Sequence, residues 1–483
     1  MPAATLIGID VGTTAVKAVL VDLGGRLHAE YAEPYPTARP RPGRVEQDPE
    51  DWLRHVLAAL AGFARGHDLR GLLGIGLTSQ VNTHVFVDAR LRPVRPAIVW
   101  QDGRAAAEAA ALDATVTAAE KLAWFGAPMP IDASHALARM AWVAAHEPEA
   151  WAATAQVLAP KDFVLARLTG TLAADPIAAV GLVGADLGYV TPLLARLDGA
   201  GRRLAPLADP LDAVGRVRDG LPCEGVPVTL GTMDAWAGMF GVGVASPGQA
   251  MYLSGTSEVM GLIAPVKVPT PGVIVFPEWR GLVMQAAPTQ AGGASLEWLA
   301  GLLGRPPAAL VDAATGEVGP ASPLFLPHLE GERAPLWDPG ARGAFAGLTT
   351  RSDAAALTLA VMEGVAFSAR LAFEALEASG GLRPPLLQAG GGGMRSDRWC
   401  RLRADAFGRP LRRMAAGHAA ALGAAVCAGV GSGAMPSLAE AAAGLVRVDT
   451  SFEPGPGAAL AEERFATFRD LYGQLRPINA RLA

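Results

Sequence analysis

The stretch that decides the fold is residues 6–22, LIGIDVGTTAVKAVLVD. Its two apolar runs, rich in Val, Ile and Leu, flank the turn Gly12-Thr13-Thr14, and this pattern predicts two strands joined as a hairpin. Asp10 ends the first run, which places a carboxylate beside a turn whose backbone N–H groups can bind phosphate. A magnesium–nucleotide complex needs this arrangement. Asp-x-Gly-Thr is short, however, and also fits a turn in which Asp and Thr only cap backbone groups.

Strands and helices alternate downstream of this hairpin. Residues 44–65 form an amphipathic pattern that Asp48-Pro49 opens, an N-cap followed by Pro in the first turn, so a helix is expected there. We expect further strands at residues 72–88 and 96–100, and further helices at residues 105–112 and 134–146. Alternation of this kind indicates an α/β fold.

A second pair of apolar runs flanks Gly255-Thr256-Ser257, almost half a chain later. This three-residue likeness alone does not decide between an internal duplication and chance. Together with the Pro/Gly-rich passage at residues 241–248, it predicts one domain of residues 1–244 and a second of residues 245–483. Two domains are also expected from a length of 483 residues. In the second half, long helices are expected at residues 353–377 and 397–407, around the glycine-rich run 389–396.

Composition narrows the class of protein. With 41 Lys+Arg against 46 Asp+Glu, the net charge of −5 lacks the basic field that nucleic-acid binding requires. A hydrophobic content of 51% excludes a disordered chain. The first residues lack the basic region of a signal peptide, and residues 414–435 are too poor in large apolar side chains to span a membrane. We therefore expect a cytoplasmic protein that binds neither nucleic acid nor membrane.

Several common catalytic signatures are absent from the sequence. A Walker A loop needs Gly-Lys-Ser/Thr, and none of the four lysines is followed by Ser or Thr. No GxGxxG follows the first strand, and neither GxSxG nor HExxH occurs. Two further carboxylates remain as candidates. Asp234 follows a β-type run, where side chains point into a cleft at strand ends. Asp102, between Trp100 and Arg104, suits a polyhydroxylated ligand. For either residue alone, an N-cap or a surface ion pair is the simpler interpretation.

In combination, these motifs resemble the FGGY family of carbohydrate kinases over essentially the whole chain. The similar segments are, in order, residues 8–22, 96–104, 158–170, 231–248, 252–260, 325–349, 389–411 and 452–477, the last being of the xylulokinase type. Each segment is a weak signal by itself, whereas eight in the right order are specific.

The resemblance implies an α/β fold of two ribonuclease H-like (actin/hexokinase-type ATPase) domains with a cleft between them. The first domain would hold the sugar and the second ATP. Asp10 would hold Mg²⁺ through its water shell, and Asp234 would take the proton from the attacking hydroxyl with an ordinary carboxylate pKa near 3.9. Residues implied to bind the nucleotide are Gly12, Thr13, Thr14, Lys17, Gly255, Thr256, Gly392, Gly393 and Ser396. Residues implied to bind the sugar are Gln80, Val81, Asn82, Trp100, Asp102 and Asp234.

The turn at residues 80–83 bears on which sugar is bound. Xylulokinases usually have Gln-Met-His-Gly there and glycerol kinases Gln-Arg-Glu-Thr, whereas this chain has Gln-Val-Asn-Thr. Loss of the Arg-Glu pair argues against glycerol, and Asn82 can donate and accept hydrogen bonds toward sugar hydroxyls. Trp236, where small residues are usual, is expected to reshape the sugar pocket.

These observations predict ATP-dependent phosphorylation of a ketopentose such as D-xylulose. Another polyol or sugar, such as erythritol, a pentitol, ribulose or glycerol, is the alternative substrate. Two hypotheses of another class are a non-catalytic nucleotide and sugar sensor, and an actin- or chaperone-like ATPase. The intact Asp10 and Asp234 argue against the sensor, and the segment Trp100–Arg104 argues against the ATPase. A homodimer is compatible with each of these hypotheses.

Overall fold

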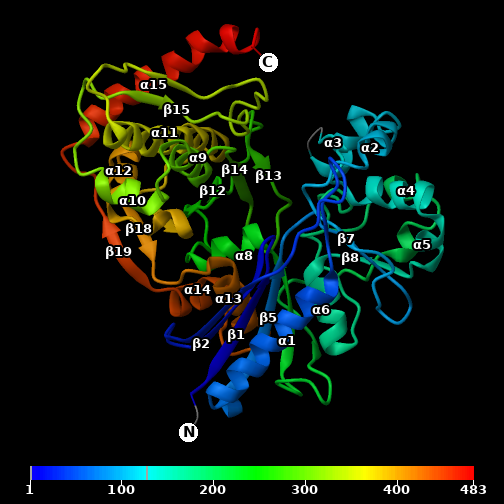
Figure 1. Cartoon of the computed structure of the whole chain (residues 1–483). Coiled ribbons are helices and arrows are strands. Elements are labelled where there is room, and N and C mark those ends of the chain that lie inside the picture. Colours follow the sequence, from blue (N-terminus) through cyan, green and yellow to red (C-terminus); the bar gives the residue numbers. More distant parts are fainter. Residues whose placement is uncertain (1–2, 127–128, 483) are drawn as a thin grey trace. The chain divides into compact units, whose positions relative to one another are not determined.

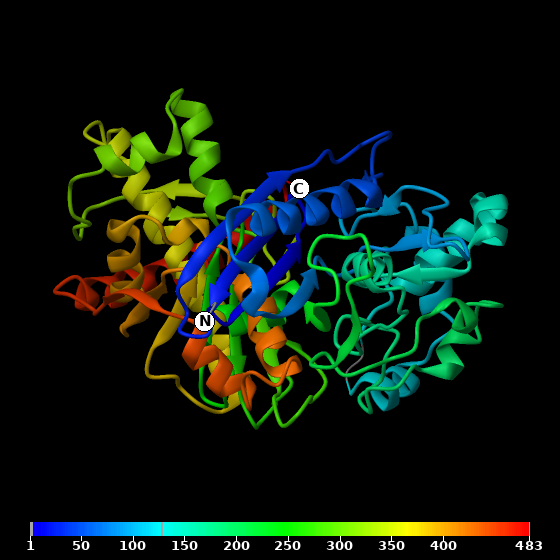
Figure 2. The same ribbon diagram turned by 90° about the horizontal axis from the view of Figure 1, so that it is seen from below.

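A computed structural model describes residues 3–126 and 129–482 (Figures 1 and 2). The chain folds into two compact units, of which unit 1 is Met1–Gly243 with His418–Val446 and unit 2 is Val244–Gly417 with Arg447–Ala483. The predicted boundary near residue 245 lies next to the observed one. The prediction of an uninterrupted second domain differs from this division, because residues 418–446 pack within unit 1.

Unit 1 is built on a six-stranded sheet of order β3-β2-β1-β5-β10-β9. The strands are β1 (Thr5–Val11), β2 (Ala15–Asp22), β3 (Leu27–Pro34), β5 (Leu72–Ser79), β9 (Ala213–Arg216) and β10 (Pro227–Met233). Strands β1, β2 and β3 are antiparallel neighbours, whereas β5 runs parallel to β1 and β10 runs parallel to β5. The predicted hairpin at residues 6–22 is confirmed, and Asp10 lies opposite Lys17 in its register.

Unit 2 is built on a seven-stranded sheet of order β13-β14-β12-β11-β17-β18-β19. Its strands are β11 (Ala250–Ser254), β12 (Glu258–Ile263), β13 (Ile274–Val275), β14 (Met284–Pro288), β17 (Leu387–Gly390), β18 (Leu411–Met414) and β19 (Val448–Phe452). As in unit 1, the first strand pairs antiparallel with the second and parallel with a later one, which has a further parallel neighbour. The two units therefore repeat one strand topology. The similar turns at residues 12–14 and 255–257 had not decided by themselves between such a duplication and chance.

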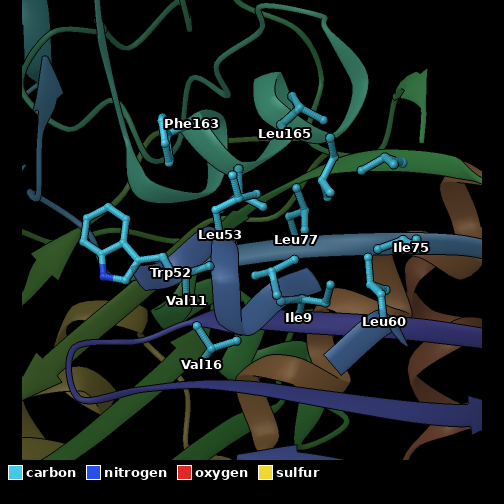
Figure 3. Packing of buried hydrophobic residues seen from close by; sticks show 14 of the residues in the cluster. Ile9, Val11, Val16, Trp52, Leu53, Leu60, Ile75, Leu77, Phe163 and Leu165 are labelled. Atoms are coloured by element: carbon cyan, nitrogen blue, oxygen red, sulfur yellow. The ribbon is translucent and has the colours of Figure 1, made fainter. Parts of the chain in front are cut away.

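The first face of the unit 1 sheet packs on two helices, α1 (Pro49–Gly66) and α6 (Pro160–Thr169). The Asp48 side chain caps α1 by accepting from the Glu50 N–H at 2.9 Å, so the predicted helix start is confirmed. Figure 3 shows the buried side chains between these layers, among them Ile9, Trp52 and Phe163. Burial of these large apolar groups is the main force that holds the layers together.

The second face of this sheet is covered by α13 (Ala419–Gly431), which also packs on α8 (Asp234–Gly241). In Figure 1 the orange α13 is drawn beside the blue strands β1 and β5. The approach is close because glycine lines it: a Cβ at Gly76 would lie 1.9 Å from the Ala424 carbonyl oxygen, and one at Gly423 would lie 1.7 Å from that of Ala237. Only residues without a side chain fit at these two positions.

The remaining elements of unit 1 are an insertion between β5 and β10, a short strand pair and a helix that follows α13. They are β4 (Glu46–Gln47), β6 (Val85–Val87), β7 (Ala97–Ile98), α2 (Ala106–Asp113), α3 (Ala118–Phe125), α4 (Ala136–His146), α5 (Pro148–Ala153), β8 (Gln156–Leu158), α7 (Thr191–Leu194) and α14 (Leu438–Leu445). The insertion has an apolar core of its own. Helices predicted at residues 105–112 and 134–146 correspond to α2 and α4.

In unit 2, helix α11 (Ala354–Gly380) packs on β12, β14 and four further helices. The other elements are α9 (Gly293–Leu303), α10 (Pro307–Ala313), β15 (Leu324–Leu326), β16 (Ala344–Ala346), α12 (Asp397–Phe407) and α15 (Ala458–Asn479). Helix α11 is long and apolar enough to cross a membrane, but 78% of its most apolar window is buried inside the protein. It is thus the core helix of unit 2, and the helices predicted at residues 353–377 and 397–407 are confirmed.

Candidate active site

Three strands of unit 1 end side by side, and a candidate residue stands near the end of each. In the register of the sheet, Asp10 lies beside Thr78, and Thr78 beside Thr232. Asp10 therefore lies at the end of β1, Gln80 follows β5, and Asp234 follows β10 as the first residue of α8. Carboxyl ends of parallel strands are the usual place for ligand binding in α/β sheets.

The two carboxylates at this edge have raised pKa values. Burial is the main cause, and it raises the pKa of Asp10 to about 7 and that of Asp234 to about 6. The charge of Lys17 opposes the shift at both residues, and the nearby Asp234 adds to it at Asp10. The expectation of an ordinary pKa for Asp234 is therefore wrong, because it took no account of desolvation.

Asp10 has the properties of a cation ligand. The residue is 6% exposed, and its buried Oδ1 has no hydrogen-bond partner among the described residues. An unpartnered carboxylate oxygen in a buried position is costly unless a cation or a proton meets it. Carboxylate oxygen is also the ligand that Mg²⁺ prefers. Asp10 therefore fits the predicted metal, whereas no group of three or more acidic, His or Cys side chains suited to hold a metal ion is found in the described part of the chain.

The turn at residues 12–14 is held by its carbonyl groups. Gly12 O accepts from the Tyr35 hydroxyl, and Thr13 O accepts from Gln47 Nε2 at 2.7 Å. The backbone N–H groups of Thr13 and Thr14 have no acceptor within the described ranges. A turn that is fixed through its carbonyls and leaves N–H groups available suits a phosphate.

The segment after β5 is tied to this turn. Gln80, Asn82 and Thr83 lie in it, with Val81 half-buried between the first two. Thr83 Oγ1 donates to Gln80 Oε1 at 3.1 Å and accepts from the Trp100 N–H at 3.1 Å. The Trp100 indole N–H in turn donates to Thr13 Oγ1 at 3.0 Å, while the residue stays 41% exposed. The structure thus brings the segment expected to bind sugar next to the turn at residues 12–14.

Two of the residues selected from sequence are buried and engaged in structural contacts. Asp102 is 2% exposed, and its two carboxylate oxygens accept hydrogen bonds from the Arg104 side chain and N–H and from the Val45 N–H. Its geometry is that of a structural ion pair with no oxygen left for a substrate. Trp236 is fully buried and packs edge-on against Phe240, with ring centroids 5.9 Å apart. Trp236 is therefore a core side chain, and its effect on the sugar pocket stays a prediction.

Arg139 of α4 is one of two site residues that sequence reasoning missed. Its fully buried guanidinium donates to the carbonyls of Asn82, Val99 (2.7 Å) and Ala133 (3.2 Å), and so joins three segments of the site. Burial without a carboxylate partner lowers its pKa to about 10, so it stays charged at neutral pH. A signal was available, because Arg139 lies one turn from Val143 on an otherwise apolar helix face.

The second glycine-threonine turn, in unit 2, is hydrogen-bonded to the start of α9. Gly255 O accepts from the Gly293 N–H at 2.9 Å, and Thr256 O accepts from the Ala294 N–H at 3.1 Å. A Cβ at Gly292 would lie 2.5 Å from the Ser257 Cα, so the approach requires glycine. As in unit 1, the carbonyls of the turn are held by neighbouring backbone or side-chain groups.

Arg403 of α12 joins this hairpin to the glycine-rich run. It is fully buried and donates to Gly393 O at 2.7 Å, to Ser254 Oγ at 2.8 Å and to Glu258 Oε1 at 3.3 Å. Gly393 packs so closely on Ser254 that a Cβ would lie 2.0 Å from its hydroxyl. Gly392 and Gly393 therefore lie beside the strand that leads to the Gly255 turn, and sequence reasoning again missed the buried arginine that holds them.

Ser396, another of the residues implied to bind the nucleotide, is the N-cap of α12. Its Oγ accepts from the Trp399 N–H at 3.3 Å, which leaves the hydroxyl proton available to a ligand.

Comparison with known proteins decides the family. Residues 5–241 match the N-terminal domain of the FGGY family of carbohydrate kinases, and residues 250–432 match its C-terminal domain. The chain belongs to this family. Its two α/β units are thus the FGGY kinase fold, and the chain is an enzyme that transfers a phosphoryl group from ATP to a sugar. The predicted family, fold class and enzyme class are confirmed.

Relatives cover the FGGY chain almost completely. The xylulose kinase of Escherichia coli (strain K12) is 32% identical over 98% of this chain and 100% of its own. The crystal structure of xylulose kinase from Rhodospirillum rubrum is 27% identical and superposes with a TM-score of 0.86 over 99% of this chain and 100% of that chain. Gluconate kinase from Lactobacillus acidophilus, 24% identical, superposes with a TM-score of 0.87 over 99% of both chains and shows that the fold is shared.

Proposed function

We propose that this FGGY kinase phosphorylates a ketopentose, with D-xylulose as the first candidate. The observation that carries the proposal is the meeting of Asp10, Gln80 and Asp234 at one edge of the unit 1 sheet, beside a turn with available N–H groups. Relatives named xylulose kinase, such as that of Escherichia coli at 32% identity, support the choice of sugar.

In the proposed mechanism, Asp234 is the general base. Its carboxylate accepts the proton of one sugar hydroxyl while that oxygen forms a bond to the γ-phosphorus of ATP. The bond between the γ-phosphorus and the bridging oxygen breaks, and ADP leaves with the electron pair. Asp234 Oδ1 also accepts from the Ala235 N–H at 2.9 Å, and this contact helps to fix the orientation of the carboxylate.

The chain's other residues bind and neutralise phosphate. Lys17 and the N–H groups of Thr13 and Thr14 would face the negative oxygens of the transferred group. Asp10 would hold Mg²⁺, and charge neutralisation on the phosphates is what this ion supplies when bound. In unit 2 we assign Gly255 and Thr256 to the phosphates, and Gly392, Gly393 and Ser396 to the adenosine.

A coupled assay of ADP release tests the substrate. We expect the highest kcat/KM for D-xylulose in a panel that also contains D-ribulose, erythritol, a pentitol and glycerol. A preference for glycerol would reject the proposed substrate. Sugar binding without ADP release would favour a sensor, and ADP release that no sugar changes would favour an ATPase of another kind.

Replacement of the proposed base tests the mechanism. Asp234→Asn keeps the size of the side chain but cannot accept a proton, so we expect kcat to fall about 10²- to 10⁴-fold. ATP affinity, measured by calorimetry, should stay within about twofold of wild type. Asp219→Asn, at an exposed turn of unit 1, is the matched control and should leave kcat unchanged. Turnover by Asp234→Asn close to the wild-type rate would refute the assignment.

A further inference from the structure

We infer that Ser134 and Asp132 fix the direction in which the Asn82 amide faces, and thereby select a substrate that offers a hydroxyl donor at one position. The inference rests on the proposed function, in which the segment after β5 contacts the sugar. It assigns a specificity role to two residues on a different segment, which precedes α4 and has no motif.

The three side chains form a hydrogen-bonded chain. Asn82 Nδ2 donates to Ser134 Oγ at 3.2 Å, and Ser134 Oγ donates to Asp132 Oδ1 at 2.7 Å. The Ser134 N–H also donates to Asp132 Oδ1, at 2.8 Å. Asn82 and Ser134 are half-buried and Asp132 is exposed, so the chain leads from solvent to the Asn82 side chain.

The chemistry of the three groups sets one direction for the chain. An ionised carboxylate only accepts hydrogen bonds, so the Ser134 proton points to Asp132. The Ser134 oxygen then has lone pairs to offer, and the group that faces it must donate. For Asn82 this is the NH₂ group, so its carbonyl Oδ1 is turned away from Ser134. The orientation of the amide thus follows from its hydrogen-bond partners.

The backbone on both sides of this chain is fixed by one residue. Arg139 donates to the carbonyl oxygens of Asn82 and of Ala133, the neighbour of Ser134. Asn82 itself has a φ of 52°, in the left-handed region that Asn tolerates better than most residues. Because the backbone is held in this way, rotation of the amide is the main freedom left at Asn82, and Ser134 limits it.

The consequence for the sugar is a requirement for a donor. The Oδ1 of Asn82 accepts one hydrogen bond from a substrate O–H, and a sugar that lacks this hydroxyl, or holds it on the other face of the carbon, loses the bond. An amide able to turn would instead offer NH₂ or oxygen equally well and would discriminate less.

The test compares Ser134→Ala with wild type on D-xylulose and on its 1-, 3- and 4-deoxy analogues. We expect Ser134→Ala to raise KM for D-xylulose about 3- to 10-fold, the effect of one neutral hydrogen bond, with kcat changed less than about twofold. On the one deoxy analogue that lacks the recognised hydroxyl, the two proteins should have equal KM. Ser134→Thr, which keeps the hydroxyl, should restore most of the wild-type KM.

Asp132→Ala provides a second, independent variant at an exposed position. It should raise KM as Ser134→Ala does, and the double variant should be no worse than either single one, because both act through Asn82.

The inference is overturned if both single variants keep the wild-type KM, if their effects add, or if the KM ratio is the same on every analogue. Absence of phosphorylation of any sugar by the wild-type protein would instead overturn the proposed function, and the inference with it.

Discussion

Asp234 is a carboxylate whose surroundings bring its pKa near the pH at which it must work. Its pKa is raised to about 6, mainly by burial. A base of this pKa is mostly ionised at neutral pH, and it holds a proton more firmly than a solvated Asp would. The edge of the unit 1 sheet thus provides both the position and the basicity that proton transfer from a hydroxyl needs.

The pH profile of activity should therefore have an acid limb that follows the ionisation of Asp234. Because the base must be ionised, kcat/KM for the sugar should fall about tenfold per pH unit below about pH 6, measured at saturating Mg-ATP. Asp219→Asn, the exposed control, should show the same profile. An acid limb centred near pH 4 would mean that the base is a solvated carboxyl, and would contradict the assignment.

The raised pKa of Asp10 predicts a cost in stability. Its native pKa of about 7 lies above the unfolded value, so its contribution to stability is present at low pH and is lost as the pH rises through 7. Asp10→Asn removes this titration. We compare the free energies of unfolding of Asp10→Asn and of wild type without metal or nucleotide. The value for the variant minus that for wild type should rise by about 2 to 3 kcal/mol from pH 5 to pH 8. Urea unfolding measures it, and a constant difference would contradict the raised pKa.

Individual residues differed in how far the sequence could place them. Asp10 and Asp234 follow apolar runs, and strand ends are local features that a sequence displays. Asp102 stands in an equally suggestive motif, but its oxygens are taken by Arg104 and by the Val45 N–H, a contact that depends on the folded chain. Arg139 contacts carbonyls from three separate segments, and no local pattern encodes such a meeting.

At the scale of elements, α13 packs closely on the unit 1 sheet because glycines at the contact carry no side chain. The short length and Ala/Gly composition of α13 give only a weak helix signal in the sequence. Its partners β1 and β5 lie near the opposite end of the sequence. Long strands and capped helices such as α1 were predictable, because their periodicity and caps are local. The surface on which a small-residue helix packs was not predictable, because it depends on a distant part of the chain.

Glycine at this contact should be essential to stability. Gly423→Ala places a Cβ 1.7 Å from the Ala237 carbonyl oxygen, so α13 and α8 must separate, and we expect a loss of about 1 to 3 kcal/mol or more. Gly473→Ala is the control, because Gly473 lies in α15 with open space around it; alanine there should add up to about 1 kcal/mol. Urea unfolding distinguishes the two, and equal effects would contradict the close packing.

The Arg403 contacts predict an effect limited to the nucleotide. Arg403→Met removes the group that joins Gly393 to Ser254, so we expect KM for ATP to rise about 10-fold or more while KM for the sugar changes little. Arg401→Met, on the same helix with a side chain 68% exposed, should leave both constants unchanged. Thermal melting checks that the Arg403 variant is folded. An equal rise in both KM values would argue against a local role.

At the scale of the whole molecule, the chain repeats one strand topology and then returns to its first unit. The sequence displayed both hairpins through their glycine-threonine turns, but these turns did not decide between a duplication and chance. The return of the chain to unit 1 was not visible in the sequence, because a division at one Pro/Gly-rich passage assumes that each domain is continuous. Residues 418–446 instead complete unit 1.

The return should be visible in hydrogen exchange. Amides of α13 should exchange at the rate of β1 and β5, whose unit they complete, and their rate should stay unchanged when Arg403→Met loosens unit 2. Exchange of α13 in step with the neighbouring strand β18 would contradict the division of the chain.

Helix α13 also determines when the protein can fold during its synthesis. The first 243 residues leave the ribosome without the helix that covers one face of their sheet, and this helix follows only after much of unit 2 has been made. At about 5 to 20 residues per second, the exposed face waits on the order of 10 to 40 s. An apolar face that stays uncovered for this time is prone to aggregation, whereas unit 2 lacks only residues 447–483 once unit 1 has been completed.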